Sequence, residues 1–274
     1  MMKSLLYLLC ILGTGILFAE ESTQYQVGVG SAFSMKNWSE RPEQFSRKDV
    51  RPPPAKLSFG LFKLHDENSL SLKASLSFLD SQSSFLYLSP TFSHQFSFVQ
   101  VFGGVEGSFS SFSEDSKYDK TAFNADMVGA FIGAKINLWT IDFHATFYAR
   151  KVGETEIAGN EGVKTKMAHE SDRVQKYGAI WKTQKFAVEG ELARFLFGET
   201  TIVSKEFYYR VEKNTLYRTG LGAGAFMGDL ELWGRFYQFK TPDDELAIYY
   251  QAPSFVPDYT LSKRSVFVEL IWKI

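Results

Sequence analysis

The stretch SVFVELIWKI, residues 265–274, alternates between two kinds of side chain. One set is entirely apolar and consists of Val266, Val268, Leu270, Trp272 and Ile274. The other set contains the charged residues Glu269 and Lys273. Because successive side chains of a β-strand point to opposite faces, this stretch predicts a strand with one apolar and one polar face.

The same alternation recurs along the chain and is clearest at residues 70–78, where leucine, alanine and phenylalanine alternate with serine and lysine. Aromatic residues make up 16% of the sequence, with 26 Phe and 13 Tyr, which favours β-structure over helices. Twelve strands are predicted in all. They span approximately residues 25–33, 56–64, 69–79, 84–93, 96–109, 121–136, 139–151, 173–182, 186–197, 215–226, 229–240 and 262–274.

The first residues of the chain have the pattern of an export signal. Met1, Met2 and Lys3 precede an apolar run from Leu5 to Phe18, and a polar stretch begins at Glu20. The run is shorter than the roughly 20 apolar residues that a membrane-spanning helix needs. Residues 1–19 are therefore predicted to be a signal peptide and residues 20–274 the mature domain.

An export signal followed by many alternating strands, with a last strand such as 265–274, resembles bacterial outer-membrane β-barrel proteins. In that class the insertion machinery recognises the alternating apolar residues of the terminal strand. The resemblance implies a location in the cell outer membrane, with outer-membrane lipid and the insertion machinery as partners.

The predicted connections between strands alternate between short and long, as expected for such a barrel. The short connections are residues 65–68, 93–95, 137–138, 183–185 and 227–228, and the long ones are 34–55, 110–120, 152–172, 198–214 and 241–261. The connection 80–83 is the exception: the alternation predicts a long connection at this position, but it is short. The predicted fold class is all-β: a transmembrane, antiparallel, up-and-down barrel of twelve strands, with ten or fourteen as alternatives. The short connections and both termini should lie on the periplasmic side and residues 152–172 outside the cell.

Three tryptophans lie near predicted short connections. Trp139, Trp181 and Trp272 share the apolar face and are predicted to form an aromatic girdle at the periplasmic membrane interface. Pro90 and Arg194 do not fit the strand pattern. Pro90 cannot donate a ladder hydrogen bond, and Arg194 falls on an apolar face unless a bulge shifts the register.

Most charged strand residues share the opposite, inward face. The predicted lumen-lining residues are Lys73, Glu106, Lys135, Asp142, His144, Arg150, Lys176, Glu189, Glu191, Arg218, Glu231, Arg235 and Glu269, with Lys182 and Lys273 on the same face. A barrel of about eight strands is filled by side chains and one of roughly sixteen to eighteen leaves an open channel, so twelve should leave a narrow lumen. We interpret the chain as a narrow, porin-like channel for small polar or charged solutes. An occluded structural barrel and a surface-binding, adhesin-like barrel are the alternatives.

An outer-membrane hydrolase is a less favoured alternative. Asp142-Phe143-His144 resembles the Asp-x-His element of outer-membrane aspartyl-type proteases, but it follows a predicted short turn and so lies at the wrong end of the barrel. The run Gly220-Leu221-Gly222-Ala223-Gly224 lacks the strand-to-helix context of a phosphate-binding loop and predicts a strand bend. We therefore expect no catalytic residues.

No metal, cofactor or nucleic acid is expected. His65, His94 and His169 lie in predicted turns or loops without metal-ligand spacing. A formal net charge of -1 implies no nucleic-acid partner.

Overall fold

The computed structural model describes residues 23–37, 55–78, 84–115, 120–153, 155–158, 164–203, 208–211, 213–240 and 262–274. The predicted signal peptide, residues 1–19, lies outside these residues and stays a prediction. No helix within the described part of the chain is long and apolar enough to cross a membrane.

Twelve long strands make up the body of the molecule, as predicted, with boundaries that differ from the prediction by a few residues. They are β1 (Thr23–Asn37), β2 (Ala55–His65), β3 (Asn68–Phe78), β4 (Ser84–Phe96), β5 (Val99–Asp115), β6 (Lys120–Leu138), β7 (Ile141–Val152), β10 (Asp172–Lys182), β11 (Phe186–Phe197), β14 (Asn214–Met227), β15 (Leu230–Lys240) and β16 (Ser262–Lys273). Each is long enough to cross a bilayer as a tilted strand, which takes about 9 to 11 residues.

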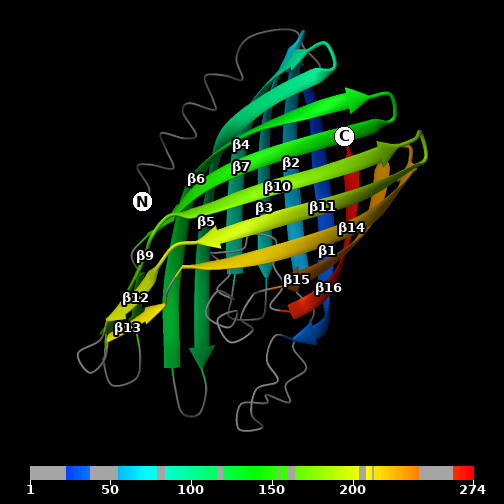
Figure 1. Cartoon of the computed structure of the whole chain (residues 1–274). Helices are drawn as coiled ribbons and strands as arrows, with labels where there is room; N and C mark the ends of the chain where they lie inside the picture. The colour runs from blue at the N-terminus through cyan, green and yellow to red at the C-terminus, as the bar shows by residue number, and fades with distance from the viewer. Residues whose placement is uncertain are drawn as a thin grey trace.

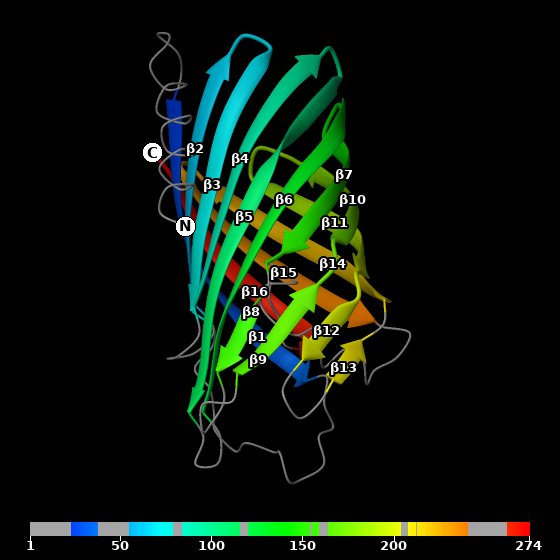
Figure 2. The same ribbon diagram turned by 90° about the vertical axis from the view of Figure 1, so that its left-hand side faces the viewer.

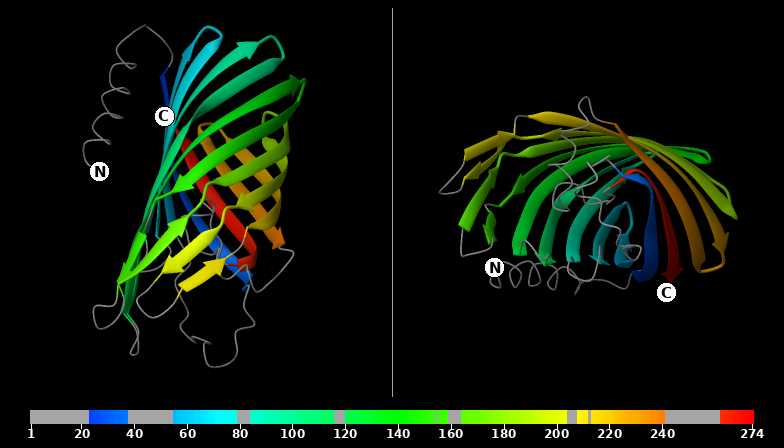
Figure 3. Two further views of the ribbon diagram at one scale, coloured as in Figure 1. Left: turned by 60° about the vertical axis from the view of Figure 1, so that its left-hand side comes forward. Right: turned by 90° about the horizontal axis from the view of Figure 1, so that it is seen from below.

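These strands close into a barrel. Each pairs antiparallel with its neighbour in the order β1 to β7, β10, β11, β14, β15 and β16, and β16 pairs back with β1. The closing pair is fixed by two backbone hydrogen bonds between Tyr25 and Ile274, of 3.0 and 2.9 Å. Viewed from below, the strands form a curved wall around an interior (Figure 3, right). Closure satisfies the backbone hydrogen bonds of every long strand, as a membrane requires.

The outer surface of the wall is apolar because alternate residues of each strand face outward. On β16 the outward residues Val268, Leu270 and Trp272 are exposed, whereas Glu269 between them is buried inside. The same alternation exposes Val27 and Val29 on β1. In water these side chains would form a large unfavourable apolar surface, so the outer face matches a hydrocarbon environment.

The connections fall on two rims. The turns β2–β3, β4–β5, β6–β7, β10–β11 and β14–β15 are short and meet at one end, the short-turn rim. The opposite ends of the long strands form the long-connection rim, and the two rims are separated along the strands in Figures 1 and 2. Two predicted boundaries at the short-turn rim were wrong. β4 continues through Phe96, so its turn lies at Ser97 and Phe98, and Trp139 lies in the β6–β7 turn with a φ of 52°.

Four short strands were not predicted. β8 (Thr155–Ala158) and β9 (Lys164–His169) lie in the predicted loop 152–172, and β12 (Thr200–Val203) and β13 (Tyr208–Val211) lie in the predicted loop 198–214. They extend the sheet sideways from β6 in the order β8, β9, β12, β13, at the long-connection rim (Figure 2). Such four-residue strands depend on their neighbours for stability, so local sequence gives only a weak signal for them.

Neither unusual strand residue introduces a bulge. Pro90 lies within β4, and the register is the same on both sides of it, with Leu88 opposite Gly107 and Thr91 opposite Gly104. Arg194 does face outward, opposite Gln175 and Tyr217 in an unbroken register, and its side chain is exposed. The bulge that would have turned Arg194 inward is therefore absent from β11.

Candidate functional site

The inner wall of the barrel is the candidate site, because it brings charged residues from distant parts of the chain together. Strand alternation places every predicted lumen-lining residue there. They are Lys73 on β3, Glu106 on β5, Lys135 on β6, Asp142, His144 and Arg150 on β7, Lys176 on β10, Glu189 and Glu191 on β11, Arg218 on β14, Glu231 and Arg235 on β15, and Glu269 on β16. Whether these residues line a solute path stays a prediction.

A deeply buried ion pair joins Glu106 and Arg150. Arg150 Nε donates to Glu106 Oε1 at 2.5 Å and Nη2 donates to Oε2 at 3.2 Å. The Tyr87 hydroxyl donates to the same carboxylate at 2.9 Å, and the Arg150 guanidinium lies 4.9 Å from the centre of the Tyr148 ring. The two charged side chains are 1% and 0% exposed, so each depends on the other for its stability in this position.

A second network surrounds Arg235. Its Nε donates to Glu189 at 2.5 Å and its Nη1 donates to Glu269 at 3.1 Å. Glu269 also accepts a hydrogen bond of 3.1 Å from the Ser58 hydroxyl and lies 3.8 Å from Lys56 Nζ. The network therefore connects strands β2, β11, β15 and β16 across the interior.

Arg218 is buried among aromatic rings. Its Nε and Nη2 donate to Glu191 Oε1 at 3.0 and 2.5 Å. The guanidinium lies 4.7 Å from the Tyr237 ring centre, 5.6 Å from that of Phe195 and 6.0 Å from that of Phe239. Cation–π contacts of this kind stabilise a desolvated arginine.

Near the short-turn rim the charges are closer to water. Asp142 Oδ2 lies 3.5 Å from Lys182 Nζ and 4.0 Å from Lys135 Nζ. Glu231 forms an ion pair with Lys273 and accepts a hydrogen bond of 3.0 Å from Trp233 Nε1. These residues form two groups of paired charges, one around Asp142 and one around Glu231.

Among the described residues, two cavities within the wall are relevant to the site. The larger, of about 320 Å³, is lined by charged residues from six strands, with Ser58, Ser75 and Tyr87 contributing hydroxyl groups. The smaller, of about 220 Å³, is lined by His144, Glu189, Glu191 and Tyr237 among others. Arg235 lines both, so the two spaces are neighbours.

The glycine run of β14 leaves space for large side chains inside the barrel. The inward glycines Gly220, Gly222 and Gly224 lie opposite large side chains of β11 and β15. A Cβ at Gly224 would lie 2.8 Å from the Trp233 ring, and one at Gly222 would lie 2.6 Å from Glu189 Oε1. The predicted strand bend stays a prediction, and the missing side chains of these glycines make room for Trp233 and Glu189.

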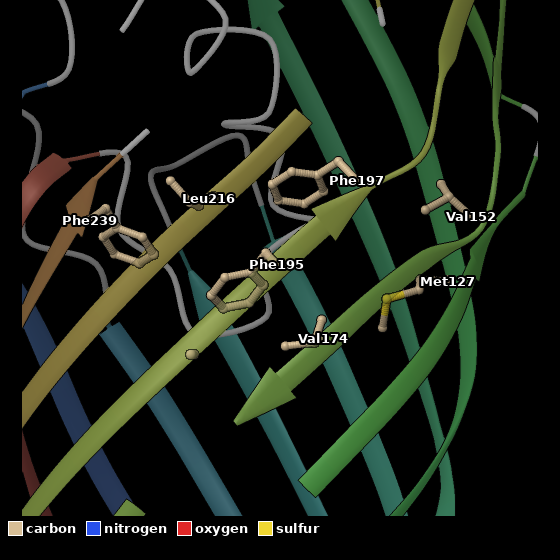
Figure 4. Close-up of a cluster of buried hydrophobic side chains, with 8 residues drawn as sticks. Met127, Val152, Val174, Phe195, Phe197, Leu216 and Phe239 are labelled. Atoms are coloured by element: carbon tan, nitrogen blue, oxygen red, sulfur yellow. The ribbon is translucent and has the colours of Figure 1, made fainter. Parts of the chain in front are cut away.

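A buried apolar cluster inside the barrel was also missed by the sequence analysis. Figure 4 shows its side chains gathered on one face of neighbouring strands. The cluster consists of Met127, Val152, Val174, Ala193, Phe195, Phe197, Leu216 and Phe239. Its members lie toward the long-connection ends of β6, β7, β10, β11, β14 and β15. The signal was present in Ala193, Phe195 and Phe197, which occupy alternate inward positions on β11.

The three girdle tryptophans lie at the short-turn rim. Trp181 and Trp272 point outward and are 43% and 56% exposed, and Trp139 at its turn is fully exposed. Phe96, Phe98 and other aromatic residues are exposed at the same rim. An interfacial role for these residues stays a prediction.

The predicted loop residue His169 is instead buried at the end of β9. Its Nε2 lies 2.6 Å from Asp172 Oδ1, which also accepts a hydrogen bond of 2.9 Å from the Gly198 backbone. Nearby, at the exposed edge of this rim, the hydrogen bond from Lys213 lowers the pKa of Glu170 below its ordinary value. These contacts hold the short strands to the barrel and do not form a metal site; no group of three or more candidate ligands occurs among the described residues.

No known family model matches the chain, and no curated protein matches it significantly. Solved structures do resemble it in fold. CymD, described as a monoaromatic hydrocarbon channel, has a TM-score of 0.55 and 9% identity over 93% of this chain and 88% of its own. The toluene transporter TodX of Pseudomonas putida has a TM-score of 0.55 and 10% identity over 93% of this chain and 90% of its own. At these identities the likeness shows the fold alone.

The closed twelve-strand barrel with an apolar outer face defines the class: the chain is an outer-membrane β-barrel, located in the cell outer membrane. Its inner wall carries charged residues and encloses cavities, which distinguishes it from a uniformly packed apolar core.

Proposed function

We propose that the protein is a narrow, porin-like channel for small polar or charged solutes. The supporting observation is the charged inner wall with its cavity of about 320 Å³, lined by groups that water or a polar solute can hydrate. The fold-level likeness to proteins described as channels is compatible with this, whereas the solutes in their descriptions belong to those proteins.

Reconstitution tests the proposal directly. Purified barrel in a planar bilayer should give discrete, ohmic current steps, and liposomes containing it should swell in small neutral sugars but not in larger ones. Folding of the barrel can be checked by the change in its gel migration on heating. A barrel that is folded by this criterion but passes neither ions nor sugars would contradict channel function.

An occluded barrel is the second candidate, and the apolar cluster favours it. Phe195 and Phe197 are 1% and 3% exposed inside the wall, and the side chains of Glu106 and Arg150 are also buried. Replacing Phe195 and Phe197 together with serine would separate the candidates. An occluded barrel should begin to conduct, whereas a channel already open elsewhere should change its conductance only modestly.

Hydrolase activity is disfavoured. The Asp142 carboxylate is engaged by Lys135 and Lys182, as expected for a structural ion pair. Asp142→Asn combined with His144→Ala should leave a folded, conducting barrel. Lipid or peptide hydrolysis that disappears in this double variant would overturn the proposal.

Assembly by the insertion machinery through residues 265–274 belongs to the same proposal. Trp272 on the outward face of β16 is the aromatic residue of this stretch nearest the short-turn rim.

A further inference from the structure

The larger cavity carries an excess of positive charge. Its charged lining comprises the cations Lys56, Lys73, Arg150, Lys176 and Arg235 and the single carboxylate Glu269. Two further carboxylates, Glu106 and Glu189, lie just behind this lining. Glu106 pairs with Arg150, and Glu189 and Glu269 both pair with Arg235. Three carboxylates thus face five cations around one space, which favours negative charge there.

Two of these cations have hydrogen-bonding capacity that no described residue takes up. Lys73 is exposed to the lumen and makes no ion pair or hydrogen bond with any described residue. Arg150 is nearly fully buried, yet its Nη1 has no hydrogen-bond partner among the described residues. A buried guanidinium nitrogen without an acceptor costs free energy, which an incoming oxyanion would recover.

The rest of the lining suits a negatively charged oxygen ligand. Lys176 extends into the same space and lies 5.0 Å from the centre of the Tyr148 ring. Lys56 and Arg235 are held in place by Glu269, so they add a fixed positive field without requiring rearrangement. Preorganised cations of this kind lower the cost of binding an anion away from bulk water.

We propose that this cavity is an anion-binding constriction that makes the channel selective for small organic anions, carboxylates in particular. The inference rests on the proposed channel function and adds the class of solute. The ligand binds between Lys73 and Lys176, in the positive field of the neighbouring Arg150. Its size is limited by a cavity of about 320 Å³.

Ion selectivity of the reconstituted barrel tests the proposal. The reversal potential in a potassium chloride gradient should report several-fold greater permeability to chloride than to potassium. Lys73→Glu combined with Lys176→Glu should bring this permeability ratio below one. Lys185→Glu, the same charge change at the exposed β10–β11 turn, should leave it unchanged. Current without anion preference, or equal effects of lumenal and turn variants, would overturn the anion site while leaving channel function intact.

A binding measurement keeps the proposal testable if no current is seen. Succinate should raise the unfolding temperature of the detergent-folded barrel at constant ionic strength, because a ligand of the folded state stabilises it. The shift should be lost in Lys73→Gln and retained in Lys185→Gln. A shift without conductance would reject the channel and keep the anion site, whereas no succinate-dependent shift in a barrel that does not conduct would reject both.

Discussion

At the residue scale, large side chains inside this barrel pack against glycines that lie opposite them on the neighbouring strand. Trp233 of β15 lies over Gly224 of β14, and Glu189 of β11 lies over Gly222. Register decides these matches, since each glycine must stand directly opposite its large neighbour. A glycine of the outward face, such as Gly234, has no atoms near its missing Cβ.

Gly224→Val should therefore destabilise the barrel, whereas Gly234→Val should not. The new Cβ at residue 224 would lie 2.8 to 2.9 Å from three Trp233 ring atoms, so the ring must move. Overpacking of this kind costs about 1 to 3 kcal/mol. Urea unfolding in the presence of lipid vesicles would measure the difference, and equal stability of the two variants would contradict the packing at β14.

Buried charge gives a second prediction at this scale. Glu106→Gln removes the partner of Arg150, which is 1% exposed, and should cost about 3 to 5 kcal/mol of folding free energy. Glu231→Gln is the matched comparison, because its partner Lys273 is 33% exposed and can be hydrated. Its cost should be at most about 1 kcal/mol. A cost for Glu231→Gln as large as that for Glu106→Gln would show that burial does not govern these pairs.

At the scale of the strand, neighbouring residues face different solvents. Leu72 of β3 is an outward residue paired with Leu61 and Pro90, whereas Lys73 points into the larger cavity. Leu72→Arg should place a charge in hydrocarbon at a cost of about 2 to 4 kcal/mol near the bilayer midplane. Lys73→Glu should cost little because the residue is hydrated. If Lys73→Glu lowered heat resistance more than Leu72→Arg, the register of β3 would be inverted.

At the scale of the whole molecule, both ends of the described chain and all five short turns lie at one rim. Outer-membrane barrels keep such turns in the periplasm and expose their longer connections outside the cell. The proposed orientation therefore puts β8, β9, β12 and β13 on the cell surface and the paired charges around Asp142 at the periplasmic end.

Cysteine labelling tests this orientation. The sequence contains a single cysteine, Cys10, which lies in the predicted signal peptide. In intact cells, a membrane-impermeant maleimide should label Ser171→Cys at the long-connection rim and should not label Gln184→Cys at the β10–β11 turn. Both side chains are exposed. Rupture of the outer membrane should make Gln184→Cys reactive, and the reverse pattern would invert the topology.

The sequence by itself determined the twelve long strands and which residues face inward. These properties follow from a period of two along each strand, which is local and visible in stretches such as 70–78 and 265–274. Most connections were predicted for the same reason, since a lapse in the alternation marks a turn. The short strands β8, β9, β12 and β13 were missed because neighbouring strands, rather than their own residues, hold them in place.

Only the tertiary structure decided what the inward residues do for one another. Glu106 and Arg150 are 44 residues apart, yet their register across β5, β6 and β7 joins them in a buried pair. Lys73 and Lys176 come from β3 and β10 and meet at one cavity only because the sheet closes. Pairing, burial and cavity shape depend on curvature and register between distant strands, and alternation within a single strand contains no information about either.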